Sequence, residues 1–156
     1  MASFRHKPFT KPADVFTREE LDGIKKAVAG AELLTGGEIA VDIISDCRRG
    51  LSTKEQALAE FHRLGLDKTR EKTGVLVLII LRQKAAEILA DKGINDKVPA
   101  DYWNDIVNII VGGFKEGKPY SGICRAVGLI GDKLGEHFPR KPDDTNEITN
   151  DVTLGE

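Results

Sequence analysis

The pattern of apolar and polar positions first becomes regular at Phe16, where it predicts an amphipathic helix. Thr17 and Glu20 have the spacing of a capping box, and Phe16 and Leu21 can form the hydrophobic staple that accompanies it. Apolar residues then recur at helical spacing until a glycine pair: Leu21, Ile24, Val28 and Ala31, followed by Gly36 and Gly37. We therefore expect a helix from Thr17 to about Leu34 that packs this stripe on a sheet.

The next regular patterns have the period and composition of strands. Between residues 38 and 44, Ile39, Val41 and Ile43 alternate with smaller or polar residues, as in a strand. Residues 74–81 are continuously apolar and β-branched, which is typical of a central strand covered on both faces. A short polar turn then leads into residues 85–90, and we expect these to form a hairpin with the preceding strand.

Three more helices are predicted around these strands. Ser52 and Glu55 form a second capping box, and it opens a helix that ends near Gly65. We expect its buried face to carry Leu58, Phe61 and Leu64. A further helix runs from Pro99 to Gly117, with apolar residues at helical spacing: Trp103, Ile106, Val107, Ile110, Val111 and Phe114. The last helix has three glycines spaced to allow close helix contact: Gly128, Gly131 and Gly135.

The order of these elements predicts an α/β fold. A strand–helix–strand unit gives a right-handed parallel crossover, and the hairpin makes the third strand antiparallel. We expect an α/β/α sandwich in which a small mixed β-sheet has helices on both faces. Residues 1–140 would form this single domain, and residues 141–156, which are polar and acidic, would form a flexible C-terminal tail.

Composition excludes several functional classes. The chain has 156 residues and a formal net charge of -2, without the cluster of Lys and Arg that nucleic-acid binding requires. The N-terminus lacks the apolar core of a signal peptide, and the longest apolar run is about half the ~18 residues of a membrane-spanning helix. We therefore expect a cytoplasmic protein without a membrane anchor, a monomer by default, whose protein partner the sequence does not identify.

The two cysteines suggest a thiol hypothesis. Cys47 and Cys124 lack the spacing of a metal-chelating pair and are expected to stay reduced. Cys47 is followed by Arg48 and Arg49, whose charges would lower the pKa of its thiol and favour reactivity.

Acidic residues are predicted to meet at one end of the sheet. In a parallel pair, Glu38 begins at the same end as Gly74, and the antiparallel third strand returns there at Asp91. Asp67 lies in the connection that approaches this edge, and Asp96 follows the turn at Asp91. Glu38, Asp67, Asp91 and Asp96 are therefore the candidate ligands of one divalent cation, Ca²⁺ or Mg²⁺, with Ca²⁺ modestly preferred because flexible loops suit its variable coordination.

The alternative is that these acids are ordinary turn and cap residues. The linear calcium-binding motif is missing: counted from Asp91 as its first position, Asp96 stands where glycine is needed and Tyr102 where glutamate is needed. Lys92 could also neutralise part of the cluster without a metal ion.

Several short motifs, in this order, resemble the TPM domain family. They are Thr35-Gly36-Gly37-Glu38-Ile39, then Thr69 with Thr73-Gly74-Val75-Leu76, Asp91-Lys92-Gly93-Ile94-Asn95, Val98-Pro99, Trp103, and His137-Phe138-Pro139-Arg140 with Asp143-Asp144. The resemblance implies an α/β/α sandwich. It also implies one of two functions, since some relatives are described as calcium-dependent acid phosphatases and others act in photosystem II repair or membrane-protein assembly.

Two functional hypotheses follow. A metal-dependent phosphatase would use the cation to polarise a phosphoryl oxygen and activate water. The residues supply no nucleophile motif of the Cys-x5-Arg or DxDx(T/V) type, so no catalytic residue is assigned. The alternative is a non-enzymatic module in which the metal ion stabilises loops that bind a partner protein.

Overall fold

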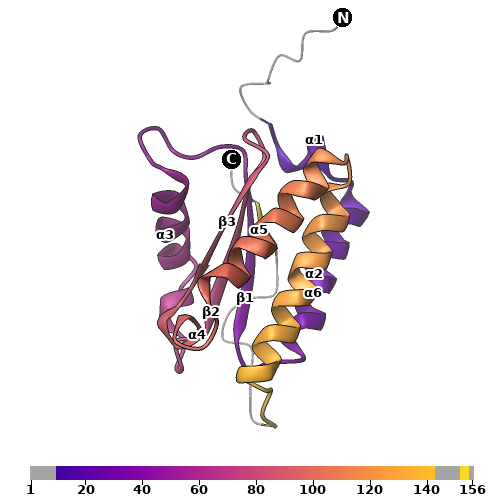
Figure 1. Ribbon diagram of the computed structural model, residues 1–156. Coiled ribbons are helices and arrows are strands. Elements are labelled where there is room, and N and C mark those ends of the chain that lie inside the picture. The colour runs from indigo at the N-terminus through magenta and orange to yellow at the C-terminus, as the bar shows by residue number, and fades with distance from the viewer. Residues whose placement is uncertain (1–9, 143–151, 155–156) are drawn as a thin grey trace, which may run out of the picture.

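The computed structural model describes residues 10–142 and 152–154, in which a four-stranded sheet lies between two layers of helices (Figure 1). In chain order the elements are α1 (Pro12–Val15), α2 (Arg18–Glu32), β1 (Glu38–Ile44), α3 (Thr53–Arg63), the 3₁₀ turn η1 (Leu66–Lys68), β2 (Gly74–Ile80), β3 (Ala85–Ala90), α4 (Lys92–Asn95), α5 (Ala100–Lys115), α6 (Pro119–His137) and β4 (Thr153–Leu154). Within the described part of the chain, no helix is both long and apolar enough to span a membrane.

The sheet has the strand order β3-β2-β1-β4. β1 and β2 are parallel, with Glu38 opposite Gly74 and Ile44 opposite Ile80, and β3 is antiparallel to β2. The parallel crossover and the hairpin predicted from the chain order are therefore confirmed, since a strand–helix–strand unit followed by a tight turn allows this arrangement.

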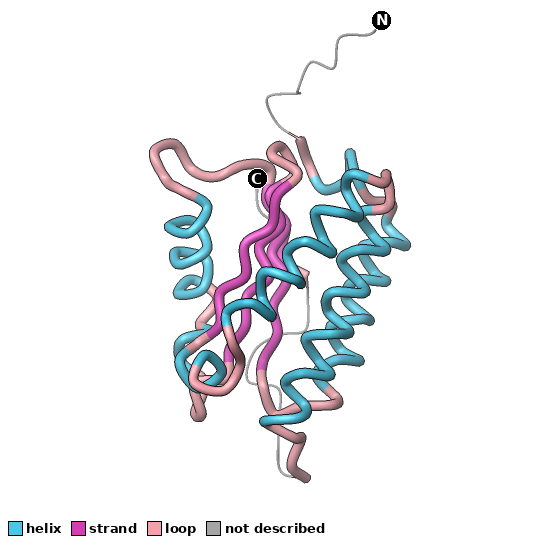
Figure 2. The backbone as a smooth tube through the Cα atoms, viewed as in Figure 1, coloured by secondary structure: helices cyan, strands magenta, loops and turns pink. Residues whose placement is uncertain are grey.

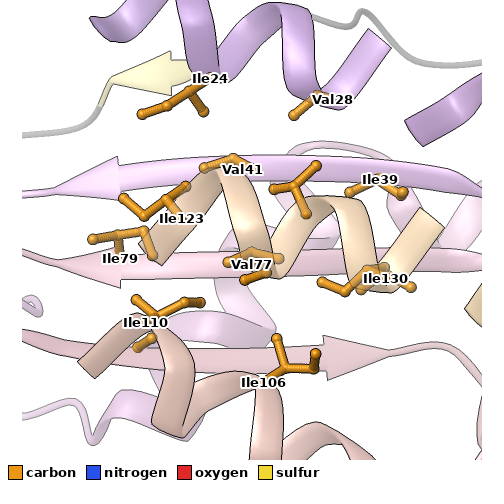
Figure 3. Close-up of a cluster of buried hydrophobic side chains, with 14 of the residues drawn as sticks. Ile24, Val28, Ile39, Val41, Val77, Ile79, Ile106, Ile110, Ile123 and Ile130 are labelled. Atoms are coloured by element: carbon orange, nitrogen blue, oxygen red, sulfur yellow. The ribbon is translucent and has the colours of Figure 1, made fainter. Parts of the chain in front are cut away.

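Alternate residues of the central strands face two different layers. All seven residues of β1 and of β2 are buried. One face packs against α2, α5 and α6, where branched aliphatic side chains interlock (Figure 3). The other face packs against α3 and η1 (Figure 2). This arrangement is the predicted α/β/α sandwich with a small mixed sheet.

The start of α2 lies where its sequence signals place it. Thr17 Oγ1 accepts the Glu20 N–H at 3.1 Å, and Glu20 Oε1 accepts the Thr17 N–H at 2.9 Å. Phe16, the first residue of the predicted staple, is buried. The helix ends at Glu32, before the predicted Leu34, because the chain turns there toward β1.

The face that α3 buries differs from the prediction. Its capping box at Ser52 and Glu55 is confirmed. Leu58, however, is 50% exposed, so the predicted burial of this residue is wrong. The helix instead buries a face of mixed polarity: Gln56, Ala57, Glu60 and Phe61. Gln56 and Glu60 can be buried on this face because they contact charged residues of β1 and of α3 itself.

Glycines of α6 allow its close contact with the end of α2, as their spacing predicted. A Cβ at Gly131 would lie 2.7 Å from the Cβ of Ala31, and one at Gly135 would lie 2.9 Å from the Leu34 carbonyl oxygen. A Cβ at Gly128 would meet nothing within 4 Å. Two of the three glycines therefore serve packing, and Gly128 does not.

The fourth strand was not predicted. Thr153 and Leu154 pair in parallel with Asp42 and Ile43 of β1, whereas we expected residues 141–156 to form a flexible tail. Residues 143–151 and 155–156 of that tail lie outside the described residues. A strand of two residues has no period that sequence could reveal, and it forms because β1 offers an open edge to a segment that is distant in sequence.

Candidate functional site

Glu38, Gly74 and Asp91 form one row across the end of the sheet. Glu38 is opposite Gly74, and the Asp91 N–H donates to the Gly74 carbonyl at 2.9 Å. Residues that are opposite one another in a sheet start their side chains toward the same face, here the side of α3 and η1, and the carboxyl group of Glu38 meets Glu32 at the end of α2. Gly74 has no side chain, and the Leu66 carbonyl oxygen of η1 occupies that space, 2.5 Å from where a Cβ would lie.

Asp91 presents an oxygen atom that no protein group satisfies. As the N-cap of α4, its Oδ1 accepts the Lys92 N–H at 2.8 Å. Its Oδ2 is buried and has no hydrogen-bond partner among the described residues. Two carbonyl oxygens pack against the same short helix, since a Cβ at Gly93 would lie 2.5 Å from Glu71 O and 2.6 Å from Lys72 O. The loop before β2 therefore brings two carbonyl oxygens to the short helix that Asp91 caps.

Glu38 is held by a second buried carboxyl group, that of Glu32. Both residues are 3% exposed, and Glu32 Oε2 accepts the Ile39 N–H at 2.9 Å. Burial, with smaller contributions from the hydrogen bond to Glu38 and the charge of that residue, raises the pKa of Glu32 to about 8 against the opposing effects of the Ile39 N–H and Arg140. Glu32 therefore keeps its proton at neutral pH and can donate it in a hydrogen bond to Glu38.

The sequence patterns did not mark Glu32 as part of the site. The available signal was its position four residues after Val28, which extends the apolar stripe of α2 with an acid. A carboxylate is rarely buried on the apolar face of a helix unless another residue of the fold pairs with it.

The other two candidate ligands, Asp67 and Asp96, lie outside the row formed by Glu38, Gly74 and Asp91. Asp67 Oδ2 is 2.9 Å from His62 Nδ1, and this hydrogen bond lowers the pKa of Asp67. Its Oδ1 is buried without a hydrogen-bond partner in the described part of the chain. Asp96 is exposed at the C-terminal end of α4. Among residues 10–142 and 152–154, no group of three His, Cys, Asp or Glu side chains could hold a metal ion. A cation here would need backbone carbonyls or water in addition to carboxylates.

A second buried carboxyl pair, Asp42 and Glu60, lies further along β1. Asp42 is fully buried, and its Oδ1 accepts the Thr153 hydroxyl at 2.7 Å. Glu60 Oε2 accepts Arg63 Nε at 2.8 Å, and the Arg63 guanidinium is also 3.6 Å from Asp42 Oδ2. Gln56 Nε2 donates to Glu60 Oε1 at 3.2 Å.

The proton of this pair resides on Asp42. Burial raises the pKa of Asp42 to about 7, and the hydrogen bond to Glu60 contributes to the rise. Burial also acts to raise the pKa of Glu60, but the hydrogen bonds from Asp42 and Arg63 outweigh it and hold that pKa below its ordinary value. A cavity of about 210 Å³ borders Glu60 and Arg63 and is also lined by Leu154. The sequence patterns did not predict this cluster, and its one visible signal was an acid within an apolar strand.

The thiols do not have the predicted electrostatic activation. Cys47 and Cys124 are both free and partly buried. Burial and the nearby charge of Asp46 raise the pKa of Cys47, so the expectation that Arg48 and Arg49 would lower it is wrong. Burial likewise raises the pKa of Cys124. Both shifts favour the unreactive thiol over the thiolate.

Comparisons with known proteins identify the family of this chain. The chain is similar to the BA42 protein of the psychrophilic bacterium Bizionia argentinensis, with 33% identity over 94% of this chain and 99% of that chain, and a TM-score of 0.82. The N-terminal domain of a protein from P. gingivalis shares the fold, with 14% identity over 81% of each chain and a TM-score of 0.66. No curated protein matches. The model of the TPM domain matches residues 9–133, and the chain therefore belongs to the TPM domain family.

Proposed function

We propose that this TPM domain binds one divalent cation, Ca²⁺ or Mg²⁺, at the end of the sheet where Glu38 and Asp91 share a row. The observation that supports the proposal best is the buried Oδ2 of Asp91, which has no hydrogen-bond partner among the described residues. Burying a polar oxygen in this state costs about 1–3 kcal/mol, and more when the group is charged. A bound cation would remove that cost.

The surrounding donors suit a hard cation with mixed oxygen ligands. The loop before β2 brings the carbonyl oxygens of Glu71 and Lys72 to the start of α4, and Asp67 has a second buried oxygen, Oδ1. Ca²⁺ accepts carboxylate, carbonyl and water oxygens in irregular geometry, whereas Mg²⁺ requires a near-ideal octahedron. A site assembled from loops therefore favours Ca²⁺.

Glu32 would act as a positioning residue at this site. Its protonated carboxyl group forms a hydrogen bond with Glu38, which fixes the orientation of that side chain. Asp96 is exposed at the far end of α4 and would contribute only through water. This difference makes Asp96 a matched control for Asp91.

The acid phosphatase activity implied by the family resemblance belongs to the same proposal. When bound, the cation would polarise a phosphoryl oxygen. The competing proposal is a non-enzymatic module in which the ion only fixes the loops. The two are distinguished by phosphate release from an aryl phosphate, measured with Ca²⁺, with Mg²⁺ and with a chelator.

Cation binding itself is tested by titrating Ca²⁺ and Mg²⁺ into the ¹⁵N-labelled protein and following its amide signals by NMR. We expect shifts that centre on Glu38, Asp67 and Asp91. Asp91→Asn preserves the N-cap but removes the charge, and should weaken Ca²⁺ binding more than about tenfold, or ~1.4 kcal/mol. Asp96→Asn should change it less than about twofold. Equal effects of the two substitutions, or no shift at the row in the wild type, would refute the site.

A further inference from the structure

The edge of the sheet formed by β3 presents unpaired backbone groups. β3 ends the strand order on that side. Because Asp91 donates to Gly74, the alternation of an antiparallel ladder turns the N–H and C=O groups of Ala86, Ile88 and Ala90 away from β2. Asn95 Nδ2 donates to the outward Ala90 carbonyl at 2.8 Å, which confirms this direction. The remaining outward groups have no partner in the described part of the chain.

A groove runs along this edge. Its cavity of about 540 Å³ lies between α5 on one side and the start of α3 on the other, both of which contact β3. β3 lies between these two helices in Figure 1. The floor is formed by residues 87–90 of β3, and the walls carry Lys54, Trp103, Asn104 and Val107. This volume is within the ~300–1,000 Å³ range of binding sites.

Trp103 supplies a second and independent feature of the groove. The residue lines the cavity and is 8% exposed, yet its Nε1 is buried with no hydrogen-bond partner among the described residues. A buried indole N–H normally has an acceptor. A ligand that brings a carbonyl or hydroxyl oxygen into the groove would provide one.

The sequence of β3 has few of the features that keep exposed edge strands from pairing. Edge strands are ordinarily shortened, charged, bulged or interrupted by proline. β3 has six residues, AAEILA, with Glu87 as its one charge and no proline. The opposite edge of the sheet, by contrast, carries β4.

We propose that this groove binds an extended peptide segment of a partner protein, which adds to β3 as a further strand. The outward N–H and C=O groups of β3 select an extended backbone. On the α5 side the segment would place small or apolar side chains against Val107 and an acceptor oxygen near Trp103 Nε1. On the α3 side it would place polar side chains beside Lys54 and Glu87.

A single extended segment fits this edge better than a second copy of the chain. In a second copy, β3 is likewise flanked by its own α3 and α5, so two recessed edges could not approach to the ~4.8 Å spacing of paired strands. This inference concerns a different place from the cation site, and the two can be tested separately.

The test uses a phage-displayed library of random dodecapeptides, selected on the full-length wild-type protein. Ile88→Pro removes an outward N–H without removing a ladder hydrogen bond and serves for counter-selection. Selected peptides should bind Ile88→Pro more than about tenfold more weakly than the wild type. The variant loses a hydrogen bond that β3 would make to the peptide, and the proline ring changes the shape of the edge. Their binding should shift the amide signals of β3 residues.

Two further measurements do not depend on the folding of Ile88→Pro. Trp103→Phe keeps an aromatic side chain but removes the N–H with the five-membered ring that carries it, and should weaken binding about three- to tenfold. Tyr102→Phe, a neighbouring aromatic whose hydroxyl instead donates to Leu129 O, should leave it within about twofold. Only every second N–H of the bound peptide would face β3. N-methylation of that set of alternate residues should abolish binding to the wild type, whereas N-methylation of the other set should not.

Three outcomes would overturn the proposal. One is that no peptide is enriched on the wild type over Ile88→Pro. Another is that the selected peptides bind Trp103→Phe and Tyr102→Phe equally well and are indifferent to N-methylation. The third is a concentration-dependent wild-type dimer that Ile88→Pro abolishes, which would identify a second copy as the occupant.

Discussion

Replacing Asp42 by asparagine should make the protein more stable, by an amount that is largest at alkaline pH and shrinks steadily as the pH falls toward 4. Asp42 is fully buried beside Glu60, and near neutral pH it loses the proton that the pair shares. Asparagine is nearly isosteric: its amide N–H₂ can donate to Glu60 while its oxygen still accepts the Thr153 hydroxyl. The substitution therefore removes the ionisation and keeps the contacts.

The size of the effect follows from the two pKa values of Asp42. Burial raises the pKa from 3.8 to about 7, so the folded state holds a proton that the unfolded chain releases between these values. Stability is therefore lost as pH rises from about 4 to about 7. A tenfold difference in proton affinity is worth ~1.4 kcal/mol, which sets an upper limit of about 4 kcal/mol. The lowered pKa of Glu60 acts in the opposite direction, and we expect a net gain of about 2 kcal/mol for the variant at pH 8.

The assay is urea denaturation of wild type and Asp42→Asn at pH 5, 6, 7 and 8. The Glu32–Glu38 pair adds its own pH dependence to both proteins, so the quantity of interest is the difference between them. Asp105→Asn, at an exposed position of α5, controls for a general change of charge. A difference that stays constant between pH 5 and pH 8, or a variant that is less stable at pH 8, would refute the reasoning.

Three other predictions concern stability. Glu32→Gln should leave stability near pH 5 unchanged and raise it above pH 8, because the pKa of Glu32 rises from 4.5 to about 8 on folding; denaturation curves at the two pH values would show this. Thr17→Ala should cost about 1 kcal/mol through the lost N-cap, and an unchanged urea midpoint would mean that the cap does not hold the start of α2. Gly131→Ala should cost about 1–3 kcal/mol because its Cβ would overlap Ala31, whereas Gly128→Ala, in open space, should stabilise α6 by up to about 1 kcal/mol; thermal melts of the two variants should move in opposite directions.

The sequence by itself determined the elements and the order in which they connect. Thr17 and Ser52 mark helix starts through contacts with residues three positions away, so their signals are complete within a short segment. The apolar runs at residues 38–44 and 74–81 indicate strands for the same local reason. Chain order and the handedness of crossovers then brought Glu38 and Asp91 to one end of the sheet.

Tertiary structure alone decided which polar residues are buried and what they meet. Glu32 and Asp42 are acids whose raised pKa values depend on partners from other elements, and nothing in their local sequence reports those partners. The strand at Thr153 pairs with an edge of β1 that is distant in sequence, since Thr153 and Asp42 are 111 residues apart. Leu58 points outward because the polar side of α3 has charged partners in the fold. Local patterns specify backbone conformation through nearby atoms, whereas burial of a charge is determined by distant segments that share its surroundings.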